Sequence, residues 1–273
     1  MPAKRTVYFL SDHTGITVES MGRALLSQFS DLEYDTVTWP CIDSLEKAKR
    51  AADCINKTAH ESVYPPIVFS SLVEPEFRQC FSTVGALVLD FFSSFTEALE
   101  KELQIRSSPV RGHFHGAHNQ RAYNERIHAV NFAFANDDGA VTKNYPAADM
   151  ILIGVSRTGK TPTSIFLALQ YGVMAANYPL IEDDLTNDHL PEPLTGYREK
   201  LFGLTIEANQ LHRIRQERRP NSRYSSQAQC RMEVRQAESL FCHEGIPFID
   251  TTAMSIEEIS AHLTQLAGLG NRI

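Results

Sequence analysis

Hydrophobic positions along the chain recur with two different periods, and the change from one to the other predicts alternating strands and helices. Short apolar runs rich in β-branched and aromatic side chains predict buried strands, while apolar residues three to four positions apart predict helices. The expected strands cover residues 6–10, 34–39, 66–72, 86–91, 149–155, 173–178, 201–206 and 246–250. The expected helices cover residues 16–29, 43–60, 95–103, 119–135, 160–171, 207–219, 227–244 and 255–267.

Residues at the helix ends support this assignment. Two helix starts carry an N-cap type of residue followed three positions later by glutamate, which is the spacing of a capping box: Asp43 with Glu46, and Ser255 with Glu258. Three expected helices stop at a glycine, which favours the left-handed backbone of a helix end: Gly172, Gly245 and Gly268.

Strands that alternate with helices predict parallel sheets covered by helices on both faces. Residues 106–123 break the alternation, because they are rich in Gly, His, Ser and Arg and poor in aliphatic side chains. We therefore expect an α/β protein with two lobes and mostly parallel sheets. The N-terminal lobe would cover residues 1–105 and serve target docking or regulation. A connector with one helix would cover 106–144, and a C-terminal lobe 145–273.

An uninterrupted G-x-x-x-x-G-K-[ST] pattern joins the expected strand 149–155 to the expected helix 160–171, as a P-loop requires. Its glycines bring the backbone close to phosphates, its N–H groups form an anion nest, and its lysine adds a positive charge. The C-terminal lobe is therefore expected to be P-loop NTPase-like, with Lys160 as a catalytic residue. The predicted nucleotide-binding residues are Gly154, Val155, Ser156, Arg157, Thr158, Gly159, Lys160 and Thr161.

A nucleotide site of this kind also needs a carboxylate for Mg²⁺, usually at the end of a neighbouring strand. Asp90 and Asp250 each end an expected strand. Asp250 lies in the same lobe as the P-loop, so Thr161 and Asp250 are the predicted metal ligands. Either aspartate can also be a polar residue that simply ends a strand.

Paired carboxylates precede the P-loop lobe at Asp137 and Asp138, followed by Gly139. Such a pair could bind Mg²⁺ or accept a proton from a substrate hydroxyl, which makes both residues catalytic candidates. The same residues also form an ordinary helix-terminating turn. The acidic residues 182–184 have the same two interpretations, a functional group of carboxylates or an ordinary turn.

Five arginines fall within residues 213–223 of an otherwise acidic chain. Guanidinium groups match phosphate oxygens and can stabilise a transferring phosphoryl group. Arg218, Arg219 and Arg223 are therefore the predicted phosphate clamp. The alternative is a solvated helix face that forms salt bridges with Glu217 and other surface acids.

The bulk composition narrows the range of functions. The chain has 273 residues and a net charge of −7, from 26 Lys and Arg against 33 Asp and Glu, which disfavours general nucleic-acid binding. Its five cysteines include no C-x-x-C pair, so we expect neither disulfides nor a thiolate zinc site. No segment predicts a membrane span or a signal peptide, so we expect a soluble cytoplasmic protein. His113, His115 and His118 lack a completing ligand nearby.

Two segments, one in each expected lobe, are weakly similar in sequence. The strand–turn–helix TVYFL-SDHTG-ITVES (residues 6–20) is similar to ILIGV-SRTGK-TPTS (residues 151–164), and each contains T-G-x-T. A βα turn commonly contains Ser, Thr and Gly, so this similarity indicates either an ordinary turn or a second anion-binding turn in the N-terminal lobe.

Four segments together resemble one known family over nearly the whole chain and in the same order. They are residues 8–29 (YFLSDHTGITVESMGRALLSQF), 134–139 (FANDDG), 151–184, which contains GVSRTGKTPTS, and 221–234 (NSRYSSQAQCRMEV). The chain resembles the phosphoenolpyruvate synthase regulatory proteins, which are closely related to the pyruvate, phosphate dikinase regulatory proteins. Many dikinase-type relatives carry Ser-Lys where Gly159 and Lys160 stand here, so the likeness favours the synthase as target.

The resemblance implies a bifunctional regulator of phosphoenolpyruvate synthase. Such proteins use ADP as donor to phosphorylate a threonine beside the catalytic histidine of the synthase, which inactivates it. They reverse the modification with inorganic phosphate and release pyrophosphate. The implied partners are ADP, inorganic phosphate, Mg²⁺ and the synthase, with no nucleic acid and no membrane; a homodimer is one option. Two rival functions remain, an ATP-dependent small-molecule P-loop kinase and a non-enzymatic nucleotide-sensing regulator.

Overall fold

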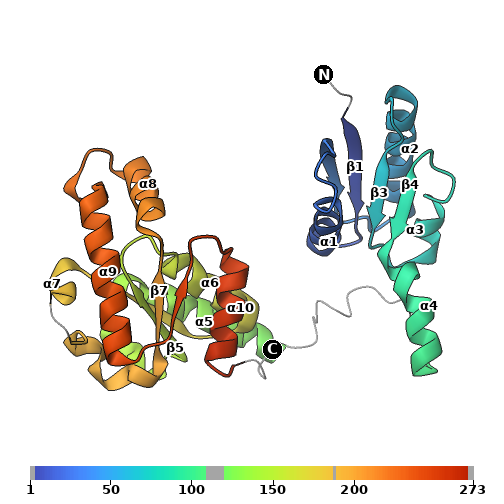
Figure 1. Ribbon diagram of the computed structural model, residues 1–273. Helices are drawn as coiled ribbons and strands as arrows, with labels where there is room; N and C mark the ends of the chain where they lie inside the picture. The colour runs from blue at the N-terminus through green and yellow to red at the C-terminus, as the bar shows by residue number, and fades with distance from the viewer. Residues whose placement is uncertain (1–3, 109–119, 187–188, 270–273) are drawn as a thin grey trace. The chain divides into compact units, whose positions relative to one another are not determined.

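A computed structural model describes residues 4–108, 120–186 and 189–269. The chain divides into two compact units, residues 1–117 and 118–273 (Figure 1). The helix after residue 119 and the turn that follows it belong to the second unit, whereas the sequence pattern predicted a connector over residues 106–144. His113, His115 and His118 lie outside the described residues.

The first unit is built on a four-stranded sheet in the order β2-β1-β3-β4, and all of its pairings are parallel. Side chains alternate along β1, so that Val7 and Phe9 pack with α1 while Tyr8 and Leu10 pack with α2. The elements of this unit are β1 (Arg5–Leu10), α1 (Ile16–Leu26), β2 (Tyr34–Trp39), α2 (Leu45–Glu61), β3 (Ile67–Ser70), α3 (Pro75–Gln79), β4 (Leu87–Asp90) and α4 (Phe91–Leu103).

The second unit has a four-stranded sheet in the order β6-β5-β7-β8, again with every pairing parallel. Its elements are α5 (Gln120–Ala135), β5 (Met150–Gly154), α6 (Lys160–Tyr171), β6 (Ala175–Pro179), α7 (Glu182–Leu185), β7 (Leu201–Thr205), α8 (Ala208–Arg218), α9 (Gln227–Glu244), β8 (Phe248–Asp250) and α10 (Ile256–Leu266). Short 3₁₀ segments are η1 (Asp137–Gly139), η2 (Thr142–Ala147), η3 (Glu192–Lys200) and η4 (Arg223–Ser225).

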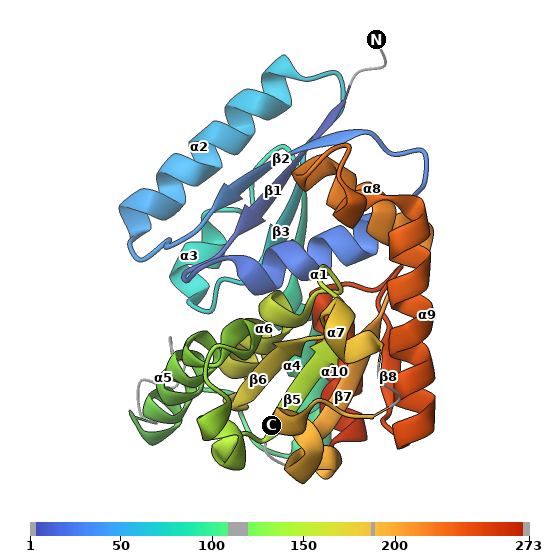
Figure 2. The same cartoon turned by 90° about the vertical axis from the view of Figure 1, so that its left-hand side faces the viewer.

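Helices cover both faces of the second sheet. Ile151 and Ile153 of β5 pack toward Leu211 of α8 and Phe241 of α9. Met150 and Leu152 pack on the other face, against Leu167 of α6 and Leu263 of α10. The alternation explains why β5 is apolar at every position, since both of its faces are buried. Figure 2 shows α5 lying beside α6, where the small side chains of Ala129 and Ala133 meet Ala168.

The predicted α/β class with mostly parallel sheets in two lobes is confirmed. The capping box at Ser255 and Glu258 is formed, and Gly172 and Gly245 cap helix C-termini in the left-handed conformation. All five cysteines are free.

Some helix boundaries differ from the sequence prediction. The N-cap of α2 is Ser44 and not Asp43, because the Ser44 hydroxyl accepts the Lys47 backbone N–H at 3.3 Å. The Asp43 carboxylate pairs with the Lys47 ammonium instead, at 2.7 Å. Helix α4 begins at Phe91, directly after β4, because the Asp90 side chain caps it. The short helices α3 and α7 were not anticipated, since each is too short to show a helical period.

Candidate functional site

Loop 154–161 connects β5 to α6 at the carboxyl end of the sheet. Gly154 has φ +154°, and a Cβ there would clash with the backbone oxygen of Leu204 on β7. Gly159 has φ +88° and is the N-cap of α6. Arg157 also has a positive φ, +80°, although it is not a glycine. The loop therefore brings its backbone close to β7 and turns sharply into the helix, as the two glycines allow.

Lys160 is folded back onto this loop. Its side chain is only 4% exposed, and the ammonium Nζ donates to the carbonyl oxygens of Gly154 at 2.9 Å and Val155 at 2.8 Å. Arg157 Nε in the loop and the Thr163 hydroxyl in the first turn of α6 are buried without a hydrogen-bond partner among the described residues. These orphaned groups and the lysine suit an anionic ligand, because an unsatisfied buried donor is costly.

Charged neighbours surround the Lys160 ammonium. Burial lowers the pKa of Lys160 to about 8, because desolvation disfavours its charged form. The negative charge of Asp138 opposes this shift, and that of Asp137 does so more weakly. The positive charges of Arg215 and Arg157 add to the lowering. The lysine thus lies within electrostatic reach of the predicted carboxylate pair and of one arginine from the 213–223 segment.

Asp137 and Asp138 form η1, the turn that follows α5. The carboxylate of Asp137 accepts the Thr161 hydroxyl at 2.8 Å, and the same oxygen accepts the side-chain amide of Asn177. The backbone N–H of Asp138 donates to Asn177 Oδ1 at 2.9 Å. Asp138 has φ +50° and an exposed side chain. The turn therefore holds Asp137 against the loop and leaves the Asp138 carboxylate open to solvent.

Asn177 is a site residue that sequence analysis missed. It lies in β6 and is fully buried, although its neighbours Ala175 and Ala176 are apolar. Both ends of its side-chain amide bind the η1 turn, so that Asn177 fixes Asp137 and Asp138 relative to the sheet. A polar side chain within an otherwise buried strand was the signal that could have identified it.

Arg215 is the member of the arginine segment that reaches the loop. It is fully buried, and its Nη2 donates to the Ser156 carbonyl at 3.1 Å and to Glu233 at 2.7 Å. Its guanidinium stacks on the Tyr224 ring at 4.1 Å, while the Tyr224 hydroxyl lies 3.0 Å from Ser156 Oγ. Arg215 and Tyr224 therefore hold Ser156 from two sides.

The arginines predicted as a phosphate clamp occupy the outside of this segment. Arg218 ends α8, and Arg219 follows it; both are exposed. Arg223 is exposed as well and forms a salt bridge with Glu182 at the start of α7. Within the acidic run 182–184, Glu182 thus pairs with Arg223, and the Asp184 carboxylate accepts the Ile181 N–H.

The two predicted metal ligands, Thr161 and Asp250, form hydrogen bonds with different partners. Asp250 ends the edge strand β8, where its carboxylate accepts the backbone N–H and the hydroxyl of Thr252. The next residue, Thr251, is the one that reaches the loop, with its hydroxyl 3.3 Å from the Thr158 carbonyl oxygen. Among the described residues, the carboxylate hydrogen-bonded to Thr161 is that of Asp137.

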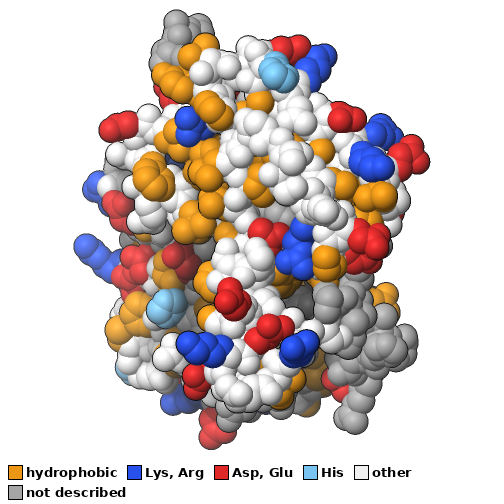
Figure 3. All heavy atoms as spheres, turned by 90° about the vertical axis from the view of Figure 1, so that its right-hand side faces the viewer, with side chains coloured by type: hydrophobic (Ala, Val, Ile, Leu, Met, Phe, Trp, Pro, Cys, Tyr) orange, Lys and Arg blue, Asp and Glu red, His pale blue; other side chains and the backbone are white. Residues whose placement is uncertain are grey.

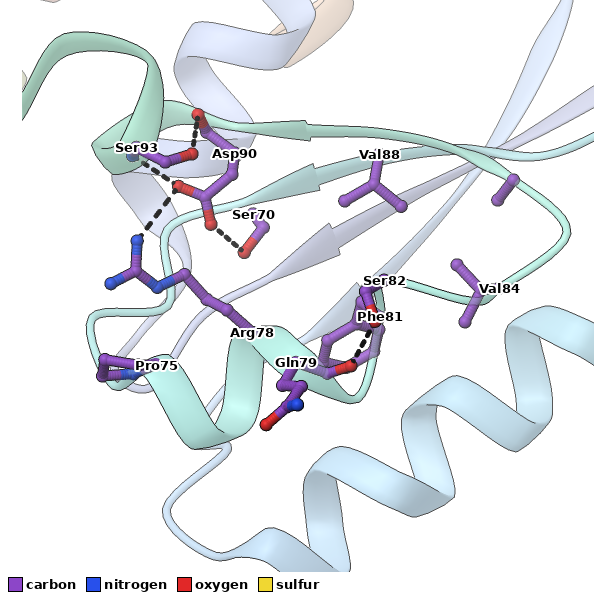
Figure 4. Close-up of a pocket in the computed structure, with 11 residues that line it drawn as sticks. Ser70, Pro75, Arg78, Gln79, Phe81, Ser82, Val84, Val88, Asp90 and Ser93 are labelled. Atoms are coloured by element: carbon purple, nitrogen blue, oxygen red, sulfur yellow. Dashed lines mark hydrogen bonds and ion pairs between the residues drawn. The ribbon is translucent and has the colours of Figure 1, made fainter. Parts of the chain in front are cut away.

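Asp90, the alternative metal ligand, lines a separate cavity of about 580 Å³ in the first unit. Figure 4 shows it at one end of this cavity, opposite the apolar side chains of Val84 and Val88. Its carboxylate accepts the Ser93 N–H at 2.7 Å and lies 4.0 Å from a nitrogen of Arg78. Asp90 therefore serves as a helix cap and ion-pair partner within its own unit.

One face of the molecule shows how its charged side chains are distributed. On the face drawn in Figure 3, Lys and Arg side chains are scattered among acidic and hydrophobic ones and form no continuous basic field. No helix within the described residues is both long and apolar enough to cross a membrane.

Comparison with known proteins gives the family. A family model described as kinase/pyrophosphorylase matches residues 7–263. A protein of Laribacter hongkongensis is 49% identical over 273 residues, with all of both chains covered. A protein of Legionella pneumophila is 48% identical over 270 residues, and one of Stutzerimonas stutzeri is 49% identical over 270, with at least 99% of each chain covered. The names of all three propose them as regulatory proteins of phosphoenolpyruvate synthase. The chain thus belongs to the kinase/pyrophosphorylase family.

Proposed function

We propose that this protein is a bifunctional, ADP-dependent serine/threonine kinase and phosphate-dependent phosphorylase that acts on phosphoenolpyruvate synthase. The observation that carries the proposal is the convergence of Lys160, Asp137 and Asp138 on loop 154–161. The family description pairs a kinase with a pyrophosphorylase, and the names of the relatives supply the target.

In the kinase direction, the loop amides and Lys160 would hold the phosphates of ADP. The ammonium would exchange its contacts with the Gly154 and Val155 carbonyls for phosphate oxygens. Asp138 would accept the proton of the target threonine hydroxyl while its oxygen attacks the β-phosphorus. The bond from that phosphorus to the bridging oxygen breaks, and AMP leaves. Asp138 suits this role because its carboxylate is exposed and close enough to Lys160 to influence the ammonium.

In the reverse direction, inorganic phosphate would occupy the same loop and attack the phosphothreonine. The bond between phosphorus and the threonine oxygen breaks, the threonine regains its proton from Asp138, and pyrophosphate leaves. One anion cradle therefore serves both reactions, because ADP and pyrophosphate share a diphosphate group.

Thr161 and Asp137 would hold Mg²⁺, since their oxygens already lie 2.8 Å apart and oxygen is the ligand this cation prefers. When bound, Mg²⁺ neutralises phosphate charge. We propose Asp137 in place of Asp250 for this role. Arg215 and Tyr224 would keep Ser156, and with it the loop, in the shape that fits phosphate. Arg218, Arg219 and Arg223 remain candidates for contact with an incoming phosphate group.

The decisive experiment incubates the purified protein with phosphoenolpyruvate synthase, the phosphodonor substrate of the synthase, and ADP labelled in the β-phosphate. The proposal expects label on a threonine of the synthase and its release as pyrophosphate after inorganic phosphate is added. γ-Labelled ATP is the parallel donor.

Two other outcomes would contradict the proposal. Transfer from ATP to a metabolite, with no label on the synthase, would identify a small-molecule kinase. Tight nucleotide binding without transfer from either donor would identify a nucleotide sensor.

A further inference from the structure

Three side chains with metal-binding atoms meet in the second unit at the C-terminal end of α9. His243 and Glu244 are the last two residues of this helix, and His189 lies just before η3. One nitrogen of each imidazole and one carboxylate oxygen all lie within 4.8 Å of one another. The two imidazole rings are tilted to each other, with centroids 6.1 Å apart.

This cluster is distinct from the loop site. Glu233, which holds Arg215 against Ser156, precedes Glu244 by 244 − 233 = 11 residues on the same helix. With a rise of about 1.5 Å per residue, the two glutamates are roughly 16 Å apart along α9. None of the three clustered residues has a role in the proposed phosphoryl transfer.

Glu244 is the fixed member of the cluster. Its side chain is 7% exposed and lies in the last turn of α9, where the negative end of the helix dipole disfavours an anion. Arg198 of η3 pairs with its oxygen Oε2. The other oxygen, Oε1, faces His243, at 3.9 Å from Nδ1. A buried carboxylate in this position is stabilised by added positive charge, and Arg198 reaches only one of its two oxygens.

The two histidine side chains of the cluster can change their rotamers. His189 is exposed, and the side chain of His243 is 59% exposed, so both imidazoles can rotate toward Glu244. Tetrahedral zinc has bonds of about 2.0–2.2 Å to nitrogen and oxygen, which requires ligand atoms roughly 3.4 Å apart. Rotation of two surface rings supplies the required approach without a change in the backbone.

We propose that His189, His243 and Glu244 form a binding site for a divalent transition metal, with Zn²⁺ as the preferred ion. Two imidazole nitrogens and one carboxylate oxygen suit zinc and related ions, whereas Mg²⁺ prefers oxygen alone. Water completes the coordination. The bound ion links the segment before η3 to the end of α9 and so stabilises the folded second unit.

The test is a Zn²⁺ titration of the full chain against a chromophoric chelator, together with thermal melting with and without Zn²⁺. The wild type should bind one Zn²⁺ at this site, and binding should raise its melting temperature because the ion binds only the folded state. His189→Ala and His243→Ala should each weaken that binding at least tenfold and lose the increase in melting temperature. His262→Ala removes an exposed histidine of α10 and should behave as wild type.

Cys242 lies beside His243 and is exposed, so it needs its own control. Cys242→Ser should bind Zn²⁺ as the wild type does, and bound Co²⁺ should show no sulfur-to-metal charge-transfer band. Unchanged Zn²⁺ affinity in the double variant His189→Ala/His243→Ala would overturn the proposal. So would loss of binding in Cys242→Ser, or a wild-type dissociation constant weaker than about 1 mM.

Discussion

The two units share a strand order but differ in what they place at the equivalent turn. In each, the first strand of the unit lies between the second and third, and a left-handed glycine then caps the following helix. Gly15 has φ +80° and ψ −3°, and Gly159 has φ +88° and ψ +8°. The next residue is Ile16 in the first unit, 68% exposed, and the buried Lys160 in the second.

This difference separates what the fold supplies from what individual residues supply. In both units a strand of the parallel sheet leads through a turn into a helix with a glycine N-cap. The first backbone N–H groups of such a helix have no partner within the helix and can bind an anion. The second unit alone adds a lysine directly after the glycine, within reach of Asp137 and Asp138. In the first unit the turn buries an acid, Asp12, whose Oδ2 has no hydrogen-bond partner among the described residues. Two turns with similar backbones therefore carry side chains of opposite charge, Asp12 in the first unit and Lys160 in the second.

The largest effect should come from removing the lysine. Lys160→Ala should lower the rates of both threonine phosphorylation and its phosphorolysis by at least about 10³-fold, because the loop loses its charge on the transferring group. The matched change in the first unit, Ile16→Ala, should leave both rates unchanged. Labelled phosphate transfer measures both variants. If Lys160→Ala keeps its activity and has a native circular dichroism spectrum, loop 154–161 takes no part in phosphoryl transfer.

Asp138→Asn should come next, with both rates lowered by about 10²- to 10³-fold, because an amide cannot accept the threonine proton. ADP affinity should change little, since the turn and its bond to Asn177 involve the backbone of residue 138. Asp137→Asn should act differently and raise the Mg²⁺ concentration needed for half-maximal rate. Equal kinetic behaviour of the two variants would show that the division of roles is wrong.

Arg215→Met should destabilise the protein by about 3 kcal/mol, because it leaves Glu233 without its buried partner. Urea denaturation measures this change. The exposed Arg218 offers the control, and Arg218→Met should alter stability by less than about 0.5 kcal/mol. If the two variants lose equal stability, the burial of Arg215 is not what distinguishes them.

The two capping glycines offer a direct comparison between the units. Gly15→Ala and Gly159→Ala should each cost about 1–2 kcal/mol of stability, because an L-residue is strained in the left-handed region. A Cβ at Gly159 would meet only Thr163 Oγ1, at 4.0 Å, so the cost there is conformational. Phosphoryl transfer should fall in Gly159→Ala alone. An equal loss of activity in Gly15→Ala would give the first unit a part in the chemistry.

The smallest effect is a dependence on pH. Because burial lowers the pKa of Lys160 to about 8, the unliganded site loses its positive charge as the pH rises through that value. ADP affinity should therefore decline above pH 8 by up to about tenfold per unit. The stability change has the opposite sign: between about pH 8 and 10.5 the unfolded chain binds more protons, so folding becomes more favourable as pH rises. Lys160→Ala should abolish both trends in calorimetric titrations.

Local features of the sequence predicted the fold well. Strand positions, the parallel arrangement and the Ser255 capping box depend on residues close together in the chain, so their signals are visible in short windows. The placement of Gly154, Gly159 and Lys160 between a strand and a helix was predictable for the same reason. Contacts across long separations were not, as with Ser156 and Tyr224, which are 68 positions apart. Which arginine of the 213–223 segment faces inward depends on the docking of α8 against α9, which spacing alone does not reveal.

The turn after α5 has a practical consequence for where this protein can be divided. A fragment that starts at residue 145 keeps all four strands of the second sheet and the whole of loop 154–161, yet it lacks Asp137 and Asp138. A fragment that starts at residue 118 retains them, together with the α5 surface that packs on α6. A recombination or gene fusion that cuts after Asp138 and before residue 145 separates the two carboxylates from Lys160, and the remaining fragment would keep its parallel sheet without them.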